Sequence, residues 1–260
     1  MLLSLFRYKF KHITLEKISL QKLKWIRGLQ IKKNREKEQL IVVEGDKIVR
    51  ELLSKSEYNI QLIVATANFI ELNTSNIACF LAKPSELQKM SSFSSSPEAI
   101  AIMPKPKTKE INTNARTLIL DGIQDPGNFG TIIRTANWFG ITQIICSNST
   151  VDQYNPKTIQ SSMGSVFQVA IHYTDLVKFL SKIKEPIYGA LLKGDSIYKT
   201  NLSKMKFLVL GNEGNGISKE VLQLITNPIL IPGKGSAESL NVGIASGIFL
   251  SEWNRCYVLV

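Results

Sequence analysis

The chain has 260 residues, of which 44% are hydrophobic, so it can bury a sizeable core in one large domain or two ordinary ones. Lys and Arg number 32 against 21 Asp and Glu, a net charge of +11, which favours a polyanionic partner, most often nucleic acid. Three scattered cysteines and two histidines argue against a disulfide framework, a metal site and a histidine triad, and no apolar run reaches the roughly 20 residues of a membrane span.

The positive charge is concentrated at the front of the chain. Residues 1–37 carry 11 basic and two acidic side chains, a net +9, whereas residues 111–260 carry 13 basic and 10 acidic side chains, a net +3. This asymmetry indicates that the front binds the polyanion and that a different activity follows it. Residues 7–11 are basic and acid-poor, which leaves an organellar transit segment as an alternative to the cytoplasmic location that we expect.

The first hundred residues predict a small α/β domain. Residues 14–37 are typical of a basic helix, and the apolar side chains that approximate a stripe along it are Leu20, Leu23, Ile26 and Leu29. Beyond this helix we expect strands at 40–45, 60–65, 77–82 and 99–103, and helices over 46–56 and from Pro84. The alternation of short apolar strands with helices defines a basic α/β domain over residues 1–103.

A second α/β domain follows a linker. Residues 104–116 are rich in proline and lysine and contain little that could be buried, so they predict a linker. From 117 we expect strands at 117–121, 143–146, 166–172, 187–192, 206–211 and 228–232, and helices near 128–139, 156–162, 175–183, 218–225 and 241–257. Apolar strands without polar alternation indicate a parallel sheet covered on both faces, with ligands bound beyond the carboxyl ends of the strands. The second domain therefore spans 117–260.

Polar residues at three strand–helix junctions of this domain are candidates for function. In the first junction, residues 121–140, Asn128 opens a helix and Arg134 lies within it among apolar residues. Asn128 could be only an N-cap and Arg134 only a solvated side chain. A cation in an apolar helix needs a partner, however, and a guanidinium binds an RNA phosphate well.

The other two junctions are rich in glycine. Glu213 lies among three glycines in residues 211–216, where the backbone can approach a ligand closely. The spacing fits neither a dinucleotide nor a P-loop fingerprint, and a carboxylate repels phosphate, so the loop suits a ligand with a cation or a hydroxyl. Farther along, Ser239 and Asn241 flank the apolar Leu240 at a helix start, where a single N-cap accounts for only one of them.

These three segments resemble a known family. The stretches NFGTIIRTA, LGNEGNGIS and IPGKGSAESLNV resemble, in order and spacing, the motifs of the SpoU/TrmH family of RNA ribose 2′-O-methyltransferases, within the SPOUT superfamily. The stretch LIVVEGDKIVRELL is similar to the ribosomal-protein-like domain that often precedes the catalytic domain and binds substrate RNA. The resemblance implies a parallel-sheet domain with a deep trefoil knot, a homodimer formed through that domain, and a smaller α/β RNA-binding domain in front.

The resemblance also implies a site and a cofactor. S-adenosylmethionine would be held, largely through backbone groups, by the loops around four residues: Leu191, Gly211, Ile231 and Leu240. Arg134 would activate the ribose 2′-hydroxyl, and because a guanidinium is a poor base it would do so either by orienting the hydroxyl or through a phosphate that relays the proton. The polar positions that organise the ribose and the donor would be Asn128, Glu213, Ser239 and Asn241. No metal is required, and Gly243, where many relatives have serine, is expected to cost no activity.

The sequence thus predicts an S-adenosylmethionine-dependent RNA 2′-O-methyltransferase that acts on ribosomal RNA of the 23S type. The alternatives are a transfer-RNA 2′-O-methyltransferase and a non-catalytic RNA-binding ribosome-assembly factor. A dinucleotide-dependent oxidoreductase is a poorer hypothesis because the chain has no GxGxxG after an early strand.

Overall fold

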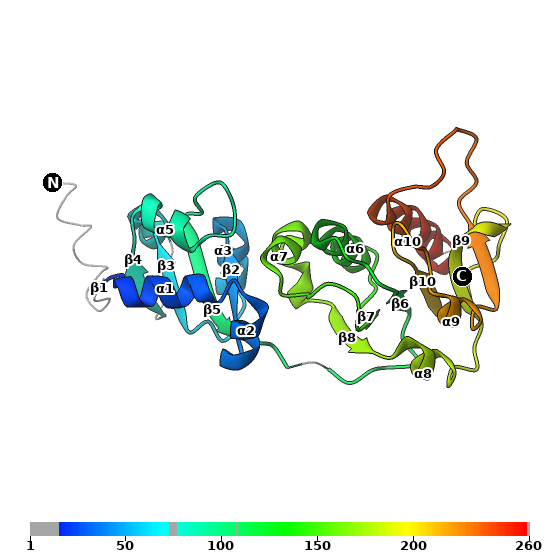
Figure 1. Ribbon diagram of the computed structural model, residues 1–260, viewed down its shortest axis with the longest axis horizontal. Helices are drawn as coiled ribbons and strands as arrows, with labels where there is room; N and C mark the ends of the chain where they lie inside the picture. The colour runs from blue at the N-terminus through cyan, green and yellow to red at the C-terminus, as the bar shows by residue number, and fades with distance from the viewer. Residues whose placement is uncertain (1–15, 73–76, 108, 259–260) are drawn as a thin grey trace. The chain divides into compact units, whose positions relative to one another are not determined.

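The computed structural model describes residues 16–72, 77–107 and 109–258, without the side chain of residue 258. The chain forms two compact units, Met1–Pro106 and Lys107–Val260, which divide within the segment 104–116 (Figure 1). Residues 7–11, the candidate transit segment, lie outside the described residues. Within the described part of the chain, no helix combines the length and the hydropathy that a membrane crossing requires.

The first unit is built on a mixed sheet. Its described strands follow the order β1-β4-β3-β5-β2, in which β5 runs antiparallel to both of its neighbours. The strands are β1 (Glu16–Lys17), β2 (Leu40–Glu44), β3 (Leu62–Ala65), β4 (Ala78–Leu81) and β5 (Ala99–Pro104). The helices are α1 (Leu20–Gly28), α2 (Lys32–Glu38), α3 (Asp46–Leu53), α4 (Ala67–Leu72) and α5 (Pro84–Met90).

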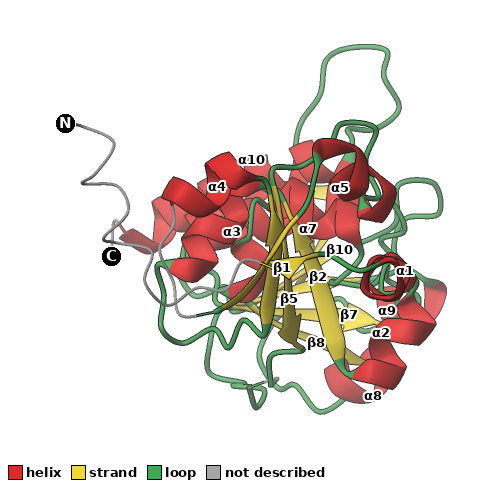
Figure 2. Ribbon diagram, turned by 90° about the vertical axis from the view of Figure 1, so that its left-hand side faces the viewer, coloured by secondary structure: helices red, strands yellow, loops and turns green. Residues whose placement is uncertain are grey.

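Helices cover both faces of this sheet. Val42 of β2 packs in one core with Ile26 of α1 and Leu87 of α5. Helices α3 and α4 lie on the opposite side of the strands from α1 and α2 (Figure 2). Because successive side chains of a strand point to opposite faces, the fully buried β2 needs apolar residues throughout, and it has them up to Glu44.

The basic segment at the front is not one helix, which corrects the expectation for residues 14–37. Residues 16–17 form β1, and α1 and α2 are separated by a turn at 29–31. Gly28 is a poor helix former, and the side chains of Asn34 and Arg35 donate to the carbonyls of residues 28–30 that a continuing helix would use. Leu20 is 77% exposed, so only the other three residues of the expected stripe are buried.

The second unit contains the predicted parallel sheet. Its described strands follow the order β11-β9-β10-β6-β7-β8, and every pair is parallel. The strands are β6 (Thr117–Leu120), β7 (Gln143–Ser147), β8 (Ala170–Thr174), β9 (Ile187–Ser196), β10 (Phe207–Leu210) and β11 (Asn227–Leu230). The helices are α6 (Pro126–Trp138), α7 (Pro156–Ser162), α8 (Leu176–Leu180), α9 (Lys219–Leu222) and α10 (Val242–Val258), with a short 3-10 helix at Ser165–Phe167. Helices α6, α7 and α10 lie on one face, and α8 and α9 on the other (Figure 1).

The strand expected at 166–172 begins only at Ala170. Met163 and Gly164 both have left-handed backbone conformations, with φ of 49° and 82°, and they turn the chain sharply after α7. Val166 is consequently buried in a 3-10 turn rather than in a strand. A short apolar run has the same pattern in a buried turn and in a buried strand, so periodicity alone could not separate them.

The end of the predicted linker packs on the second unit. The Arg116 guanidinium lies 4.2 Å from the ring centroid of Tyr257 and 5.6 Å from that of Trp253, both on α10. Its Nη2 donates to the Phe139 carbonyl at 3.2 Å, and the Trp253 Nε1 donates to the Met205 carbonyl at 3.0 Å. These contacts fix the C-terminal part of α10 against the domain.

Helix α6 packs closely against α7 because Gly130 has no side chain. We therefore predict that an alanine at position 130 destabilises the protein. A Cβ at position 130 would lie 2.7 Å from the Thr158 carbonyl oxygen and 2.8 Å from the Ser162 amide nitrogen of α7, and backbone cannot move aside easily. We expect Gly130→Ala to lower the free energy of unfolding by about 1–3 kcal/mol, as overpacking does, although alanine favours a helix. Urea unfolding measures this. Gly235→Ala, with nothing within 4 Å of its Cβ, is the control, and equal stability of the two variants would contradict the prediction.

Candidate active site

The candidate site lies beyond the carboxyl ends of β6 and β10. These neighbouring parallel strands end at Leu120 and Leu210, so the loops that follow them share one edge of the sheet. The loop after β6 leads into α6, whose first turn contains Asn128. The loop after β10 contains Glu213. Asn241 precedes α10, which packs alongside α6.

Three of the predicted residues form one hydrogen-bonded relay. Asn128 Nδ2 donates to Glu213 Oε1 at 2.7 Å, and Asn241 Nδ2 donates to Asn128 Oδ1 at 3.0 Å. An ionised carboxylate only accepts, so Asn128 must present its NH₂ group to Glu213 and its oxygen to Asn241. The Asn241 oxygen in turn accepts from the backbone amides of Gly243 and Ile244. The direction of every bond in the relay is thereby determined.

The start of α6 is fixed by Asp125, which sequence reasoning did not single out. Asp125 is the N-cap, and its Oδ1 accepts from the Asn128 backbone amide at 2.7 Å. Its Oδ2 lies 3.0 Å from the Lys157 ammonium of α7. The hydrogen bond from Asn128, followed by that from Lys157, lowers the pKa of Asp125 below its ordinary value. Asn128 is therefore held through its backbone while its side chain serves the relay.

Gly243 allows α10 to approach the relay. A Cβ at position 243 would lie 3.1 Å from Asn241 Oδ1, 3.3 Å from Thr131 Cγ2 and 3.6 Å from Asn128 Oδ1. These distances are short enough that a serine here would require its neighbours to shift by a few tenths of an ångström. Glycine at this position is thus compatible with the geometry of the site.

Arg134 differs from the expectation. Ile132, Ile133 and Ala136 of α6 are buried, but Arg134 lies on the exposed side of the helix. Arg134 makes no hydrogen bond or ion pair with a described residue. The partner expected for a cation in an apolar helix therefore does not come from the described part of this chain. The helix is apolar on one side only. The guanidinium is therefore accessible to a ligand from outside.

Ser239 is not brought into the relay. It belongs to the exposed loop 232–240, and its side chain makes no hydrogen bond to a described residue. Leu240, a predicted cofactor contact, is 48% exposed at the end of the same loop. Two other predicted contacts, Leu191 of β9 and Ile231 after β11, are half-buried.

Gly211 has a steric reason to be glycine within its own loop. A methyl group there would collide with the backbone of Gly216 and Ile217, because the loop 211–217 folds back on itself. The Asn212 and Gly216 backbones pair as an antiparallel bridge. The close approach at Gly211 is thus to the loop's own backbone, and the loop has a defined shape before any ligand binds.

Sequence reasoning missed the residues that hold this loop. Asn212, Ser218 and Asp121 link its two ends to the end of β6 through side-chain hydrogen bonds. The only signal in the sequence is an aspartate placed directly after a buried strand, at the edge where ligands bind. Among the described residues there is no group of three or more His, Cys, Asp or Glu that could hold a metal ion.

Two family models match the chain. The SpoU rRNA Methylase family model matches residues 115–251, and the MRM3-like substrate binding domain model matches residues 21–101. Together these matches cover both structural units, and the first includes all of the relay.

Relatives and solved structures agree with these models. The 23S rRNA (guanosine(2553)-2′-O)-methyltransferase RlmP of Bacillus subtilis (strain 168) is 30% identical over 236 residues, which cover 88% of this chain and 94% of the relative. A TrmH-family structure from Porphyromonas gingivalis has a TM-score of 0.81 at 36% identity, covering 92% of this chain and 98% of that one. The AdoMet-bound rRNA methyltransferase from Sinorhizobium meliloti has a TM-score of 0.78 at 27% identity, covering 92% and 97%.

The capping contacts of Asp125 predict how its carboxyl group titrates. Because the pKa of Asp125 is lowered, its contribution to folding is complete above the ordinary aspartate pKa and is lost as the pH falls through the lowered value. We expect Lys157→Met to raise the pKa of Asp125 but to leave it below the ordinary value, since the larger cause, the Asn128 amide, remains. A carboxyl-carbon NMR titration measures both values, with Lys178→Met as the control. A return to the ordinary pKa would show that the ion pair is the main cause.

Proposed function

Because the chain belongs to the SpoU rRNA methylase family, we propose that it transfers a methyl group from S-adenosylmethionine to a ribose 2′-hydroxyl of ribosomal RNA of the 23S type. The observation that carries this proposal is the relay of Asn128, Glu213 and Asn241, in which three separate motif segments meet in one place. The similarity to RlmP extends over both units, which favours ribosomal RNA as the substrate over transfer RNA.

The residues of the site fit the cofactor. Glu213 is an exposed carboxylate on a glycine-rich loop, which suits a cationic ligand and repels a phosphate. Apolar side chains that could contact an adenosine stand on the neighbouring segments, with Leu191, Ile231 and Leu240 all partly or largely exposed. We infer that these three residues and the Gly211 loop hold S-adenosylmethionine. When bound, the cofactor supplies the methyl group on an electrophilic sulfonium.

The side chains of the chain itself position the nucleophile. We infer that the exposed Arg134 guanidinium binds a phosphate next to the target ribose and either orients the 2′-hydroxyl or lets that phosphate accept its proton. Asn128, Asn241 and Glu213 would hold ribose and donor in line, and Ser239 would join them when the loop 232–240 meets its ligand. Such positioning can supply a large part of a rate enhancement.

We infer that the second unit carries the family's trefoil knot. Strand β11 lies at one edge of the sheet, beyond β9. The chain after β11 nevertheless returns toward the interior of the sheet, where α10 packs beside α6, the helix that follows β6. The loops that the chain would use to form the knot are 211–217, which follows β10, and 232–240, which joins β11 to α10. Backbone comparison with knotted relatives tests this inference directly.

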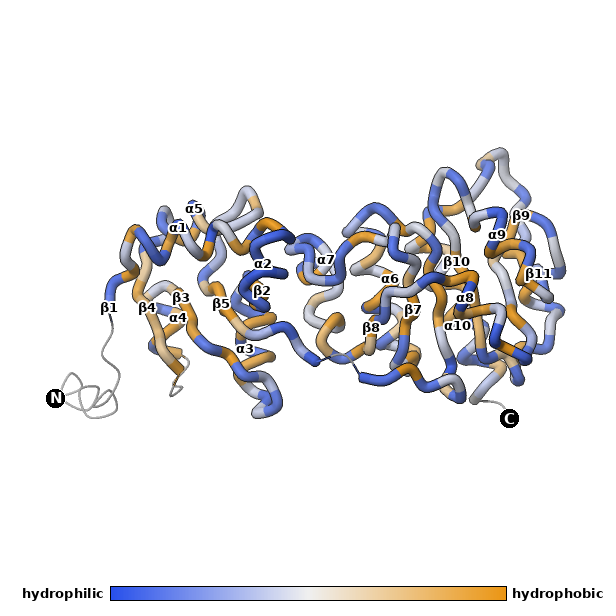
Figure 3. Tube along the Cα trace, turned by 60° about the horizontal axis from the view of Figure 1, so that its bottom comes forward, coloured by the Kyte–Doolittle hydropathy of each residue, from blue (hydrophilic) through white to orange (hydrophobic). Residues whose placement is uncertain are grey.

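The first unit offers a basic surface for RNA. Lys24, Arg27 and Lys32 are exposed on α1 and at the start of α2. Helix α2 is hydrophilic over its whole length (Figure 3). We propose that this surface contacts the phosphate backbone of the substrate and so selects the RNA, which for a bacterial ribosomal substrate would be met in the cytoplasm.

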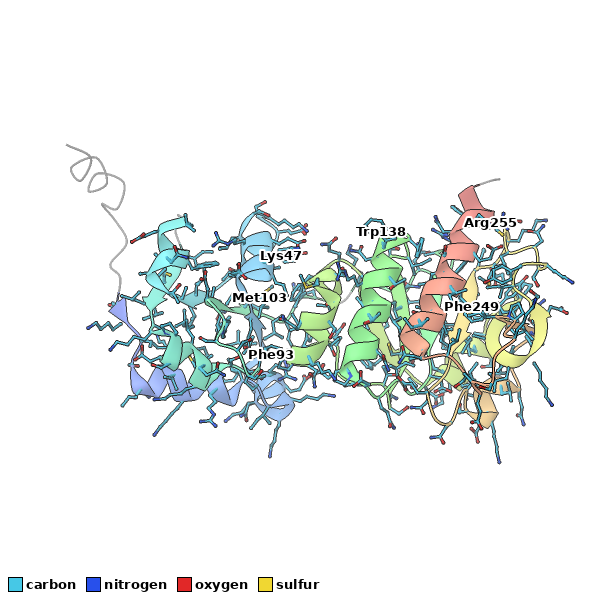
Figure 4. All side chains as sticks on the ribbon, turned by 90° about the horizontal axis from the view of Figure 1, so that it is seen from above. Lys47, Phe93, Met103, Trp138, Phe249 and Arg255 are labelled. Carbon is cyan, nitrogen blue, oxygen red and sulfur yellow. The ribbon has the colours of Figure 1, made fainter. Side chains whose placement is uncertain are left out.

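We also propose a homodimer formed through α6 and α10. Trp138 of α6 is 84% exposed and Ile244 of α10 is 58% exposed, and Figure 4 shows the two helices side by side with Trp138 at the end of α6. The helices pack closely through Gly243 against Thr131. A second copy would cover the apolar side chains on this surface and would also lie near Arg134.

Methyl transfer to RNA tests the enzymatic proposal. We expect the wild-type protein to transfer labelled methyl groups from S-adenosylmethionine to unmodified ribosomal RNA, and Arg134→Ala to lower kcat about 100-fold or more because it removes the phosphate contact that orients the hydroxyl. Lys178→Ala, an exposed charge on α8, is the matched control. Labelling of transfer RNA alone would contradict the proposal that ribosomal RNA is the substrate. RNA binding without labelling of RNA or ribosomal particles would favour an assembly factor.

Sedimentation tests the proposed dimer. We expect Trp138→Glu to convert a dimer into a monomer, because a charge would have to be buried without a partner. Leu222→Glu, which places the same charge at an exposed apolar residue on α9, should leave the dimer intact. A wild-type monomer at micromolar concentration would contradict the proposal.

A further inference from the structure

Asp121 is a buried carboxylate with no role in the scheme above. It directly follows β6 and is 8% exposed. Its Oδ2 accepts two hydrogen bonds from Ser218, one from the backbone amide at 2.8 Å and one from Oγ at 2.6 Å. Its own amide donates to the Leu210 carbonyl at 2.9 Å, which extends the β6–β10 pairing by one step. The side chain therefore joins the end of one strand to the far end of the loop that follows the other.

The near end of the loop 211–217 is hydrogen-bonded to Gly122, the residue that follows Asp121. Asn212 Nδ2 donates to the Gly122 carbonyl at 2.7 Å, and Asn212 Oδ1 accepts from the amides of Gly214 and Asn215. The Gly122 amide donates to Ser147 Oγ at 2.8 Å, at the end of β7. Asp121 and Gly122 thus hold both ends of the glycine-rich loop against the sheet edge.

Ser218 uses its hydroxyl in an unusual way for its position. It is the N-cap of α9, where a serine ordinarily accepts from an amide of the first turn, yet its side chain makes no capping hydrogen bond. The hydroxyl donates to Asp121 instead. The contact therefore serves the loop and not the helix.

We propose that Asp121 is a positioning residue, which holds the loop 211–218 so that Glu213 reaches Asn128 and the loop backbone is in place for the cofactor. Three glycines give this loop few side chains that could anchor it by packing, and Glu213 is exposed, so the hydrogen bonds of Asn212 and Ser218 at its two ends hold the loop in place. The two bonds to a desolvated carboxylate are of the strong, charge-assisted kind. The inference rests on the proposed function, because a displaced Glu213 would change how the cofactor and the ribose are bound.

Calorimetry and kinetics of Asp121→Asn test this role. The asparagine keeps the size and can accept from Ser218 through its amide oxygen, but it removes the negative charge that strengthens both bonds. We expect the Kd for S-adenosylmethionine to rise and kcat to fall by about 10- to 100-fold, the factor that corresponds to a hydrogen bond to a charged group, with KM for RNA unchanged. Ser218→Ala, which loses one of the two bonds, should show a smaller effect, and Ser218→Thr should restore wild-type values. Asp175→Asn, an exposed N-cap of α8, is the matched control.

A double variant separates positioning from folding. If Asp121 acts through Glu213, Asp121→Asn should lower kcat much less in a Glu213→Gln background than in the wild type. Wild-type Kd and kcat in folded Asp121→Asn or, should that variant not fold, in Ser218→Ala would overturn the inference, as would fully additive effects. Failure of the wild-type protein to bind S-adenosylmethionine would instead overturn the proposed function, so the two failures are distinguishable.

Discussion

The amide of Asn128 has one oxygen and one NH₂ group, and the site uses both. The NH₂ group is committed to the Glu213 carboxylate, so the oxygen must receive Asn241. These partners lie 85 and 113 residues away along the chain. They meet only because β10 adds beside β6 and α10 returns to pack on α6. The relay therefore depends on the arrangement of strands and helices in the second unit.

Helix α6 has to satisfy three requirements at once. Its first turn presents Asn128, its buried side approaches α7 through Gly130, and its outer side displays Arg134 and Trp138. Asp125 caps the first turn of the helix, and because the three surfaces belong to one helix, they would rotate together. A small shift of this helix would move the relay and the guanidinium together.

The sequence predicted the features that depend on local pattern. Uniformly apolar strands indicated the parallel sheet, and the polar residues of the three junctions included Asn128, Glu213 and Asn241, which the structure brings into contact. Features that depend on distant packing were not predictable. The exposure of Arg134 is set by which side of α6 meets the sheet, and the bond from Ser218 to Asp121 spans 97 residues. No periodicity records such a pair, and the turn at 29–31 was likewise set by side chains reaching back from α2.

The exposed basic surface of α1 and α2 and the uncharged amides of the relay differ in their response to ionic strength. Contacts between lysine or arginine and phosphate release counterions, so dissolved salt weakens them steeply, over a Debye length of about 8 Å at physiological ionic strength. The hydrogen bond from Asn241 to Asn128 joins two neutral amides, so salt affects it little. Salt would therefore weaken the capture of the RNA by the basic surface, and the proposed phosphate contact of Arg134, more than it weakens this amide contact. The ionic composition of the cell would thus change how often the RNA is bound more than it changes the packing of α10 against α6.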